Sequence, residues 1–171
     1  DEHGRIVPRL YSRTGEDISG SFPDLIEALR LPAAVDGELL VVRDGRVQSF
    51  NVLQQRLNRK SVNAKLLAEF PAHLRAYDLL VDGEAALRER PVAARRARLD
   101  AFTSRLPEPR VALSPLRPFR SCDELPSARR DSSGGRGCAA AAAGHGPCRA
   151  QIGQEHILSP SVGIIDELPI A

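Results

Sequence analysis

Two Asp-Gly dipeptides set between apolar runs restrict most strongly how this chain can fold. Asp44-Gly45 stands between the apolar residues 35–42 and the shorter run 47–50, and Asp82-Gly83 follows the apolar residues 74–81. Asp-Gly favours the two-residue turns of β-hairpins, because both residues tolerate a positive φ. The sequence therefore predicts that 35–42 and 47–50 are antiparallel partners, and that 74–81 is a buried strand closed by a tight turn.

Helical signals lie between and after these runs. Ser21 is predicted to cap a helix, because Pro23 and Asp24 follow it in the position of a first turn. The expected helices cover residues 21–30, 51–57, 62–70 and 91–105, and further strands are expected at 6–12 and 110–116. This mixture predicts an α+β fold with antiparallel sheets and flanking helices.

The pattern changes after residue 122. The text "SARRDSSGGRGCAAAAAGHGPCRA" contains Gly, Ala, Ser and Arg but few large apolar residues, and it has no helical or strand period. We therefore expect two parts, a folded domain over residues 1–122 and a low-complexity or irregular, poorly packed segment over residues 123–171. Within the second part, residues 161–171 are expected to form either a short terminal strand or an irregular tail.

Composition limits the partners and the compartment. The chain has a net charge of +2, too small by itself to indicate nucleic acid, although all 24 basic residues except Lys60 and Lys65 are arginine. Arginine suits phosphate, but GC-rich coding also produces such a bias. No apolar run approaches the roughly 18 residues of a membrane span, and no signal peptide is visible. Three irregularly spaced cysteines favour reduced thiols, so we expect a cytoplasmic protein without a membrane partner.

Several short polar motifs follow one another in a specific order. They are "SR" at 12–13, "DGE" at 36–38, "FNVLQQR" at 50–56, "AYDLL" at 76–80 and "RERP" at 88–91. Each motif alone is weak, but their order and spacing over residues 4–116 resemble the adenylation domain of ATP-dependent DNA ligases, a branch of the covalent nucleotidyltransferases. The resemblance implies an incomplete nucleotidyltransferase (ATP-grasp-like) adenylation domain.

The resemblance also implies a chemistry. In this family a lysine attacks the α-phosphate of ATP and keeps AMP as a phosphoramidate. AMP then passes to the 5′-phosphate of a nick, and the 3′-hydroxyl displaces it. ATP and Mg²⁺ are therefore the expected cofactors, nicked double-stranded DNA is the expected partner, and the protein is expected to act as a monomer.

Site residues follow from the resemblance, motif by motif. Arg13 corresponds to an arginine that reaches nucleotide or nick phosphate, for which a planar donor fork is suited. Glu38 corresponds to the acidic residue that contacts the ribose and supports the metal-bound nucleotide, and it is our expected metal residue. Tyr77 takes the place of an aromatic residue, often Phe, that stacks on adenine. The expected nucleic-acid contacts are Arg56, Arg59 and Lys60.

The chain departs from the family in two ways. The nucleophile of the family lies in a "K-x-D-G" motif upstream of the "SR" strand, and neither Lys60 nor Lys65 has that context. We expect the nucleophile upstream of Asp1, so this chain alone should not adenylate. The family's later "E-G" and "K-x-K" motifs do not follow Leu116. An RNA ligase, a capping-type nucleotidyltransferase and a non-catalytic nucleic-acid-binding remnant remain alternatives.

Simpler interpretations stand beside these roles. Arg13 and Glu38 could be ordinary surface charges, and Tyr77 a half-buried core aromatic. The arginines at 95, 96 and 98 are expected on a solvated helix face. The "GRGCAA" match at 135–140 follows polar residues rather than a buried strand, which argues against a dinucleotide fingerprint.

Overall fold

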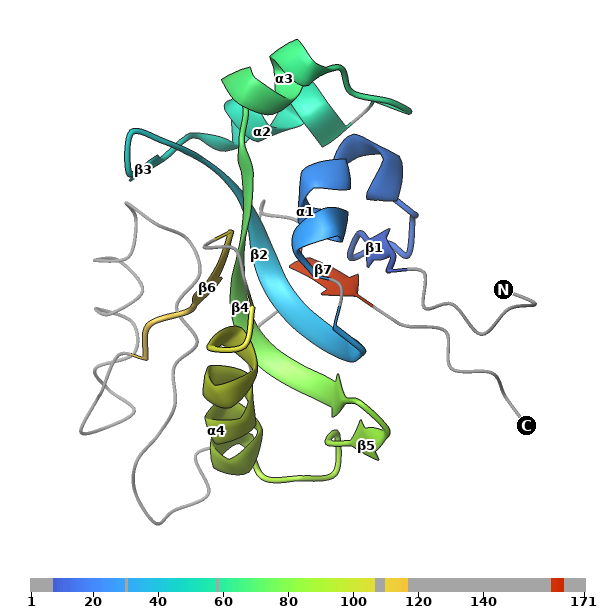
Figure 1. The fold of residues 1–171 in the computed structure, drawn as a ribbon, viewed down its shortest axis with the longest axis vertical. Helices are drawn as coiled ribbons and strands as arrows, with labels where there is room; N and C mark the ends of the chain where they lie inside the picture. Colours follow the sequence, from blue (N-terminus) through green and yellow to red (C-terminus); the bar gives the residue numbers. More distant parts are fainter. Residues whose placement is uncertain (1–7, 30, 58, 107–109, 117–160, 165–171) are drawn as a thin grey trace.

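The fold is built on two long antiparallel strands, β2 (Ala33–Arg43) and β4 (Ala72–Asp82). The computed structural model describes residues 8–29, 31–57, 59–106, 110–116 and 161–164, with side chains outside the last of these ranges. Figure 1 shows β2 and β4 crossing the middle of the molecule, with helices along their length and at one end. The predicted α+β class with an antiparallel sheet and flanking helices is confirmed.

Within the described ranges, seven strands join in one sheet, whose main order is β1-β7-β2-β4-β5. The short strands are β1 (Leu10–Tyr11), β3 (Arg46–Val47), β5 (Ala85–Ala86), β6 (Val111–Leu113) and β7 (Ser161–Ile164). β3 pairs with β2, and β6 pairs with β4 as the sheet's parallel neighbour. The terminal strand, one of the two expected alternatives for residues 161–171, is thus present at 161–164, between β1 and β2. The other residues of 123–171 lie outside the described part of the chain.

The helices cover this sheet and one end of it. They are α1 (Pro23–Ala28), α2 (Phe50–Leu57), α3 (Ala64–Glu69) and α4 (Val92–Thr103), with a short 3₁₀ turn, η1 (Ser19–Ser21), before α1. α4 packs on β4 and β6, whereas α1 contacts β4 and α2 contacts β2. No helix in the described ranges is long and apolar enough to cross a membrane.

The first Asp-Gly turn forms as predicted. Asp44 and Gly45 have φ values of 51° and 70°, and Arg43 pairs with Arg46 across them. The partner strand is shorter than expected, because β3 ends at Val47 and Phe50 already begins α2. At the second turn Asp82 itself pairs with Ala85, so Gly83 and Glu84 are the turn residues, and Gly83 has the positive φ of 62°.

Ser21 does not cap α1, contrary to the prediction. Phe22 is the N-cap residue and makes no side-chain cap hydrogen bond. The Ser21 hydroxyl donates instead to the backbone carbonyl of Arg59 at 2.6 Å. A long-range contact has therefore replaced the local one that the sequence suggested.

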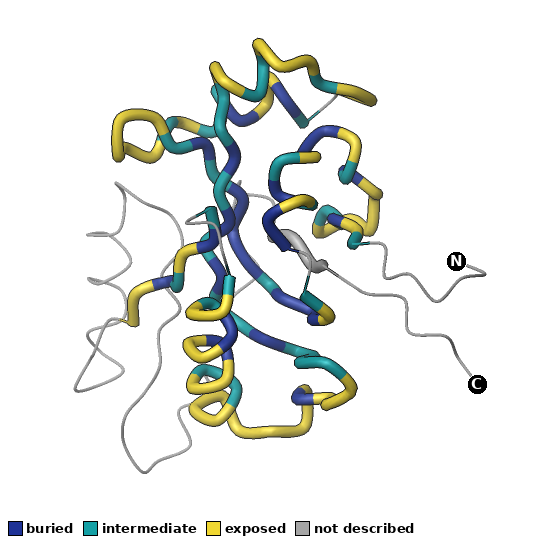
Figure 2. The backbone as a smooth tube through the Cα atoms, in the orientation of Figure 1, coloured by how far each residue is buried: buried dark blue, intermediate teal, exposed yellow. Residues whose placement is uncertain are grey.

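The core gathers between the sheet and its helices. β2 is buried along most of its length, whereas β4 alternates between buried and half-buried residues at its start. Figure 2 shows the buried centre of the two strands and the exposed outer turns of α3 and α4. Leucine dominates the core, and Phe22 and Phe102 are its two fully buried aromatic side chains among the described residues. This core fixes the register of β2 and β4, and with it the placing of the polar residues described below.

Candidate functional site

Glu38 lies opposite Arg75 in the middle of the β2–β4 pair. The Glu38 side chain is 6% exposed, and its Oε2 atom forms an ion pair with Nη1 of Arg75 at 3.5 Å. On its other side Glu38 pairs with Ser161 of β7 through the backbone. The strand register therefore holds one buried carboxylate beside one guanidinium, and the ion pair restricts the orientation of the carboxylate.

Gly37, next to Glu38, lies where β2 and β4 pack closely together. A Cβ atom added at Gly37 would lie 2.6 Å from Cδ1 of Leu74 and 3.0 Å from the carbonyl oxygen of Arg75. A side chain fits there only if the Leu74 side chain or the β4 backbone shifts. The glycine of the "DGE" motif thus allows β2 and β4 to approach closely where Glu38 and Arg75 meet.

Tyr77 sits at a β-bulge. Asp36 pairs with Asp78 and Gly37 pairs with Ala76, so Tyr77 is the additional residue on β4 between these two pairs. A bulge bends its strand and redirects a side chain, and bulges are over-represented next to active sites. Tyr77 is half-buried. The bulge brings it next to the strand segment that carries Glu38, which the sequence could not show.

Asp36 and Asp78 form an acidic pair beside this bulge. Burial, followed by the nearby charge of Asp78, raises the pKa of Asp36, and Arg88 opposes the rise. Asp78 is held by Arg95, whose Nε and Nη2 atoms donate to its two carboxylate oxygens, both at 2.8 Å. The Asp36 carboxyl is therefore harder to ionise than an ordinary aspartate, and it lies next to the residues that we expected to bind nucleotide.

The predicted solvated face of α4 is wrong for two of its three arginines. The Arg95 side chain is 16% exposed and also donates to the backbone carbonyl of Arg90 at 2.7 Å. The hydrogen bond to Asp78 raises the pKa of Arg95, although burial opposes the rise. Arg96 donates to the carbonyl of Ser114, which links α4 to the residue after β6. Only Arg98, at 60% exposure, fits the expectation.

Arg13 lies in the turn that follows β1. The turn is closed by backbone hydrogen bonds from Gly15 to Ser12 and from Ser12 to Glu16, and the Arg13 side chain is exposed. Tyr11 pairs with Gly163 of β7, which pairs with Asp36 of β2. The end of β1 is therefore level with the "DGE" segment, with β7 between them. Glu38 and Tyr77 come together on adjacent strands, and Arg13 lies at the end of the strand beyond β7.

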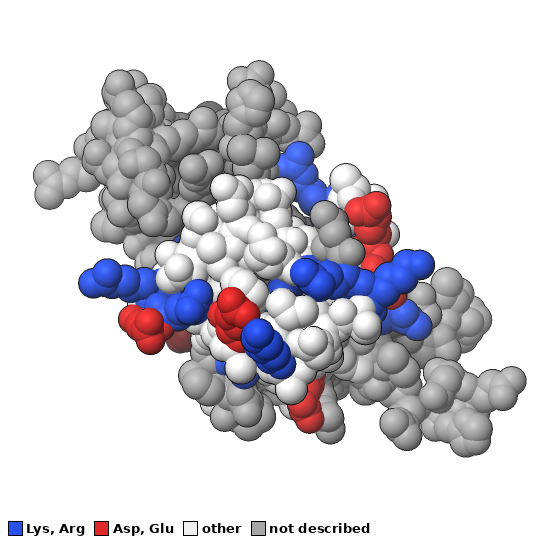
Figure 3. All heavy atoms as spheres, turned by 90° about the horizontal axis from the view of Figure 1, so that it is seen from above, with Lys and Arg blue, Asp and Glu red and all other residues white. Residues whose placement is uncertain are grey.

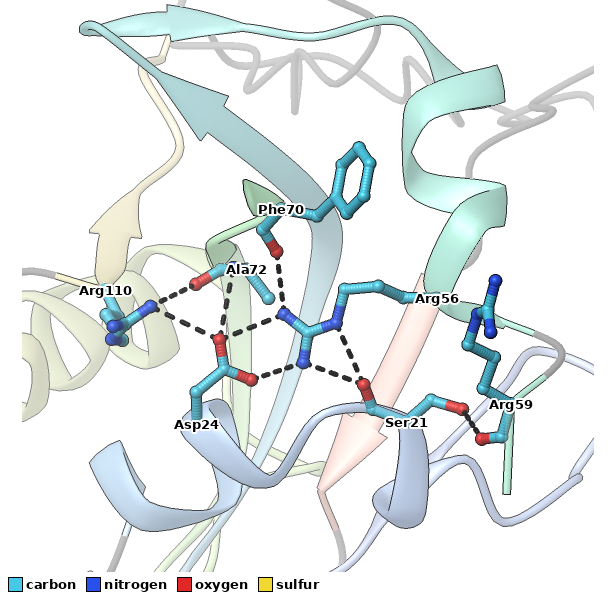
Figure 4. Close-up of polar contacts among 7 residues, drawn as sticks. All are labelled: Ser21, Asp24, Arg56, Arg59, Phe70, Ala72 and Arg110. Atoms are coloured by element: carbon cyan, nitrogen blue, oxygen red, sulfur yellow. Dashed lines mark hydrogen bonds and ion pairs between the residues drawn. The ribbon is translucent and has the colours of Figure 1, made fainter. Parts of the chain in front are cut away.

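Arg56 requires a correction, because it is a core residue. It has 0% relative exposure, so it is not available to nucleic acid in this structure. All five N–H groups of its guanidinium are used (Figure 4): Nε and Nη2 donate to the Ser21 carbonyl, Nη1 and Nη2 to Asp24, and Nη1 to the Phe70 carbonyl. The group also lies 4.7 Å from the ring centre of Phe22. Arg56 thus joins α2 to η1, α1 and the end of α3.

Arg59 and Lys60, by contrast, remain at the surface. Both side chains are exposed, while their backbone is fixed against η1. Ser21 binds the Arg59 carbonyl, and a Cβ at Gly20 would lie 2.6 Å from the carbonyl oxygen of Lys60. The protein backbone is therefore fixed here, while the two side chains stay accessible, as a contact with the phosphates of nucleic acid would require.

From the sequence alone, no such role was found for three charged residues that the structure places in these polar contacts. Asp24 was assigned only to a helix start, yet its carboxylate accepts from Arg56, from the Ala72 N–H at 3.2 Å and from Arg110 at 3.3 Å. Arg75 and Asp36 were not assigned at all. Strand alternation could have placed Arg75 on the same face as Tyr77, but its pairing with Glu38 depends on the bulge.

Comparison with known proteins identifies the relatives of this chain. The sequence model of the family described as ATP dependent DNA ligase domain matches residues 4–132. A probable DNA ligase of Koribacter versatilis is 40% identical over 99 residues, covering 56% of this chain and 17% of that protein. A probable DNA ligase of Opitutus terrae is 47% identical over 102 residues, covering 57% of this chain and 10% of that protein.

DNA ligase C1 of Mycolicibacterium smegmatis is 39% identical over 98 residues, covering 53% of this chain and 28% of that protein. The matched part of this chain therefore spans between a tenth and just over a quarter of these relatives. The match to the family covers the strands and helices from β1 to β6, including Glu38, Tyr77 and Arg13. The chain belongs to the ATP-dependent DNA ligase family, as a fragment of its adenylation domain.

Proposed function

We propose that this chain forms the nucleotide-binding wall of a DNA ligase that seals nicks through lysyl-AMP and DNA-adenylate intermediates, within a nucleotidyltransferase fold. The supporting observation is the β2–β4 bulge, which sets Tyr77 beside the ion pair of Glu38 and Arg75 in a member of this family. A carboxylate and a half-buried aromatic ring on one strand pair suit a ribose and a base.

Each residue has a role in this proposal. Glu38 accepts a hydrogen bond from a ribose hydroxyl, and the ion pair with Arg75 orients its carboxylate. Tyr77 offers its ring to adenine, and Arg13 donates to a phosphate from the end of β1. Donors and acceptors fixed before the ligand arrives lose little entropy on binding.

Mg²⁺ would be bound jointly by carboxylates of this chain and by phosphates of the nucleotide. No group of three or more metal-ligating side chains gathers among the described residues. Mg²⁺ commonly takes only one or two protein carboxylates and fills its other positions with phosphate oxygens and water. Glu38 and Asp36 would supply those carboxylates, and the metal would neutralise phosphate charge.

We also propose that neither lysine of this chain is the nucleophile. Lys60 follows α2 and Lys65 lies on α3, and both are exposed at the helical end of the sheet. Glu38 lies in the middle of β2 instead. With radiolabelled ATP and Mg²⁺, this chain should therefore form no acid-labile AMP adduct. A lysine-linked adduct at either position would contradict the assignment of the motifs.

Titration of the 171-residue chain with ATP and Mg²⁺ tests the pocket. Glu38→Gln should weaken ATP binding by about 10- to 150-fold, because a charge-assisted hydrogen bond is worth roughly 1.5–3 kcal/mol. Tyr77→Ala should also weaken it, and Tyr77→Phe should not. Glu84→Gln, at an exposed turn residue, is the matched control. Equal affinities of the Glu38 and Glu84 variants would rule out the proposed pocket.

A further inference from the structure

Arg95 binds the bulge of β4 to the start of α4. Its Nε and Nη2 atoms donate to the two carboxylate oxygens of Asp78, each at 2.8 Å. Its Nη1 atom donates to the carbonyl oxygens of Arg90 at 2.7 Å and Arg88 at 3.3 Å. One guanidinium therefore joins the residue that follows Tyr77 to the loop that leads into α4. Because two parallel hydrogen bonds are made to one carboxylate, its orientation is fixed as well as its distance.

The outer edge of β4 is interrupted at this point. β6 pairs with β4 as far as Ala76, and β5 pairs with it from Val81 onward. Among the strands of the described ranges, none pairs with this edge at residues 77–79. The contact between Arg95 and Asp78 lies within the interruption. A side-chain contact from α4 thus takes the place of a backbone ladder there.

The inner edge of β4 is irregular at the same residues. Tyr77 is the additional residue between the pair of Asp36 with Asp78 and the pair of Gly37 with Ala76. A bulged residue is left out of the ladder, so its direction depends on the residues on either side of it. Ala76 is fixed by its pairing with β6, and Asp78 is fixed by α4. The contact with α4 is therefore one of the two supports of the Tyr77 backbone.

The position of Arg95 suits a supporting role better than a direct contact with a ligand. Its side chain is 16% exposed, and all three of its guanidinium nitrogens already donate to oxygens of the protein. The charges at the end formed by α2 and α3 differ from it. Figure 3 looks onto that end and shows basic and acidic side chains standing at the surface around an uncharged area. A guanidinium whose donors are occupied acts through the groups that it holds.

We propose that Arg95, acting through Asp78, is a positioning residue that holds the Tyr77 ring against the base of the bound nucleotide. This inference rests on the proposed function for the contact between Tyr77 and adenine. A ring that is held in place before the ligand arrives loses little entropy on binding. Loss of the contact with Asp78 should therefore reduce the contribution of the base to affinity, and leave the contribution of the ribose and phosphates.

The fluorescence of Tyr77 tests the positioning without any nucleotide. The chain contains two tyrosines and no tryptophan, so Tyr77 is the only tyrosine of a Tyr11→Phe chain. In that chain Arg95→Lys keeps the positive charge, but an ammonium cannot bind both carboxylate oxygens as a planar fork does. The variant should increase the quenching of Tyr77 by acrylamide, a neutral quencher, toward the value of the urea-unfolded chain.

Arg105→Lys is the matched control, because Arg105 also joins the α4 region to β4. Its Nη2 atom donates to Asp82 at 2.7 Å, at the end of the same strand and beyond the bulge. The control should leave the quenching of Tyr77 unchanged. Both variants are measured at a temperature at which circular dichroism shows them fully folded. Equal quenching in the two variants, or no change in either, would overturn the proposal.

Titrations with ATP and with ribose 5′-triphosphate, which lacks the base, separate positioning from a general weakening of the fold. Tyr77→Ala removes the stacking and should weaken ATP binding by about 5- to 150-fold. Arg95→Lys should weaken ATP binding by less than this and leave the binding of ribose 5′-triphosphate unchanged. Added to Tyr77→Ala, it should have no further effect on ATP. Equal losses for the two ligands, or additive losses in the double variant, would contradict a role through Tyr77.

The same titrations distinguish this inference from the proposed function. ATP binding by Tyr77→Ala as tight as that of the unaltered chain would remove the adenine contact of the proposed function, and this inference with it. Weakened ATP binding by Tyr77→Ala, with no effect of Arg95→Lys on ATP or on quenching, would remove the present inference alone.

Discussion

Asp24 and Arg56 form a buried, two-pronged ion pair that joins α1 to α2. Nη1 of Arg56 lies 3.0 Å from Oδ2 of Asp24, and Nη2 lies 2.5 Å from Oδ1. The two side chains are 9% and 0% exposed. The geometry matches the planar fork of a guanidinium to a carboxylate, and it shows why the "LQQR" segment ends in arginine.

Arg56→Ala should destabilise the fold strongly. Without Arg56, the Asp24 carboxylate keeps only the Ala72 N–H and Arg110, and the acceptors of the Arg56 fork lose their donors. Breaking a buried ion pair costs about 3–5 kcal/mol in the free energy of unfolding. Arg56→Lys should restore little, because an ammonium cannot reproduce five N–H bonds. Urea denaturation measures the change, with the exposed Arg59→Ala as control. A stable Arg56→Ala chain with weakened duplex binding would instead restore the original nucleic-acid assignment.

Acid should weaken the fold through Asp24. Burial raises the pKa of Asp24, but the hydrogen bonds and charge of Arg56, with further help from Ala72 and Arg110, outweigh it and lower the pKa below its ordinary value. A carboxyl with a lowered folded pKa stabilises the fold above its unfolded pKa of about 3.9, and that stabilisation is lost as pH falls through the folded pKa. We expect this loss below about pH 4.

Asp24→Asn should remove this dependence of stability on pH. The variant should be less stable at pH 7, and its stability should fall less steeply below about pH 4, because the titrating group is gone. Urea denaturation between pH 7 and pH 2 gives both curves. Parallel curves for the variant and the unaltered chain would show that Asp24 does not carry the acid sensitivity.

Asp36→Asn should have the opposite effect on stability. Burial and Asp78 raise the pKa of Asp36, so its contribution to stability is present below the unfolded pKa and is lost as pH rises through the folded pKa. At pH 7 the charged form opposes folding, and the amide should therefore stabilise the chain. The gain should disappear at low pH. Asp44→Asn, at an exposed turn position, is the control, and a destabilised Asp36→Asn chain would contradict this account.

Arg95→Ala should cost more than its place on a surface helix suggests. It removes two charge-assisted hydrogen bonds to Asp78 and one to the Arg90 carbonyl, so we expect a loss of about 1.5–3 kcal/mol in the free energy of unfolding. Arg98→Ala removes a largely exposed side chain whose ion pair is with Asp82 at 3.5 Å, and it should change stability by less than about 0.5 kcal/mol. Thermal denaturation compares the two, and equal losses would argue against a structural role for Arg95.

A chain that ends at residue 160 should lose stability in one part of the sheet. β7 pairs with Leu10 and Tyr11 of β1 and with residues 35–38 of β2. Without it, backbone groups on both strands lose their partners, and unpaired strand edges are prone to association. Amide exchange should become faster at these positions and stay slow at the β2–β4 pairs 39–41. Unchanged exchange at Leu10 and Tyr11 would show that β7 does not hold β1.

Local signals in the sequence determined the elements of the fold. The Asp44-Gly45 turn, the two long apolar runs and the helix after Pro91 all appear in the structure, because each depends on backbone preference and short-range periodicity. The motif order also determined the family. For residues 161–171 the sequence left a short terminal strand and an irregular tail open, because a strand of four residues that is paired on both sides needs little pattern of its own.

Only the tertiary structure decided what each charged residue does. Arg56, Arg59, Arg75 and Arg95 are chemically identical in the sequence, yet the fold buries the first, exposes the second and pairs the other two with carboxylates on strands. A guanidinium is stable in the core only where several acceptors converge on it. Around Arg56, these acceptors come from segments as far apart as residues 21 and 70. The Glu38–Arg75 pair lies beside a bulge at Tyr77, which no local pattern indicates.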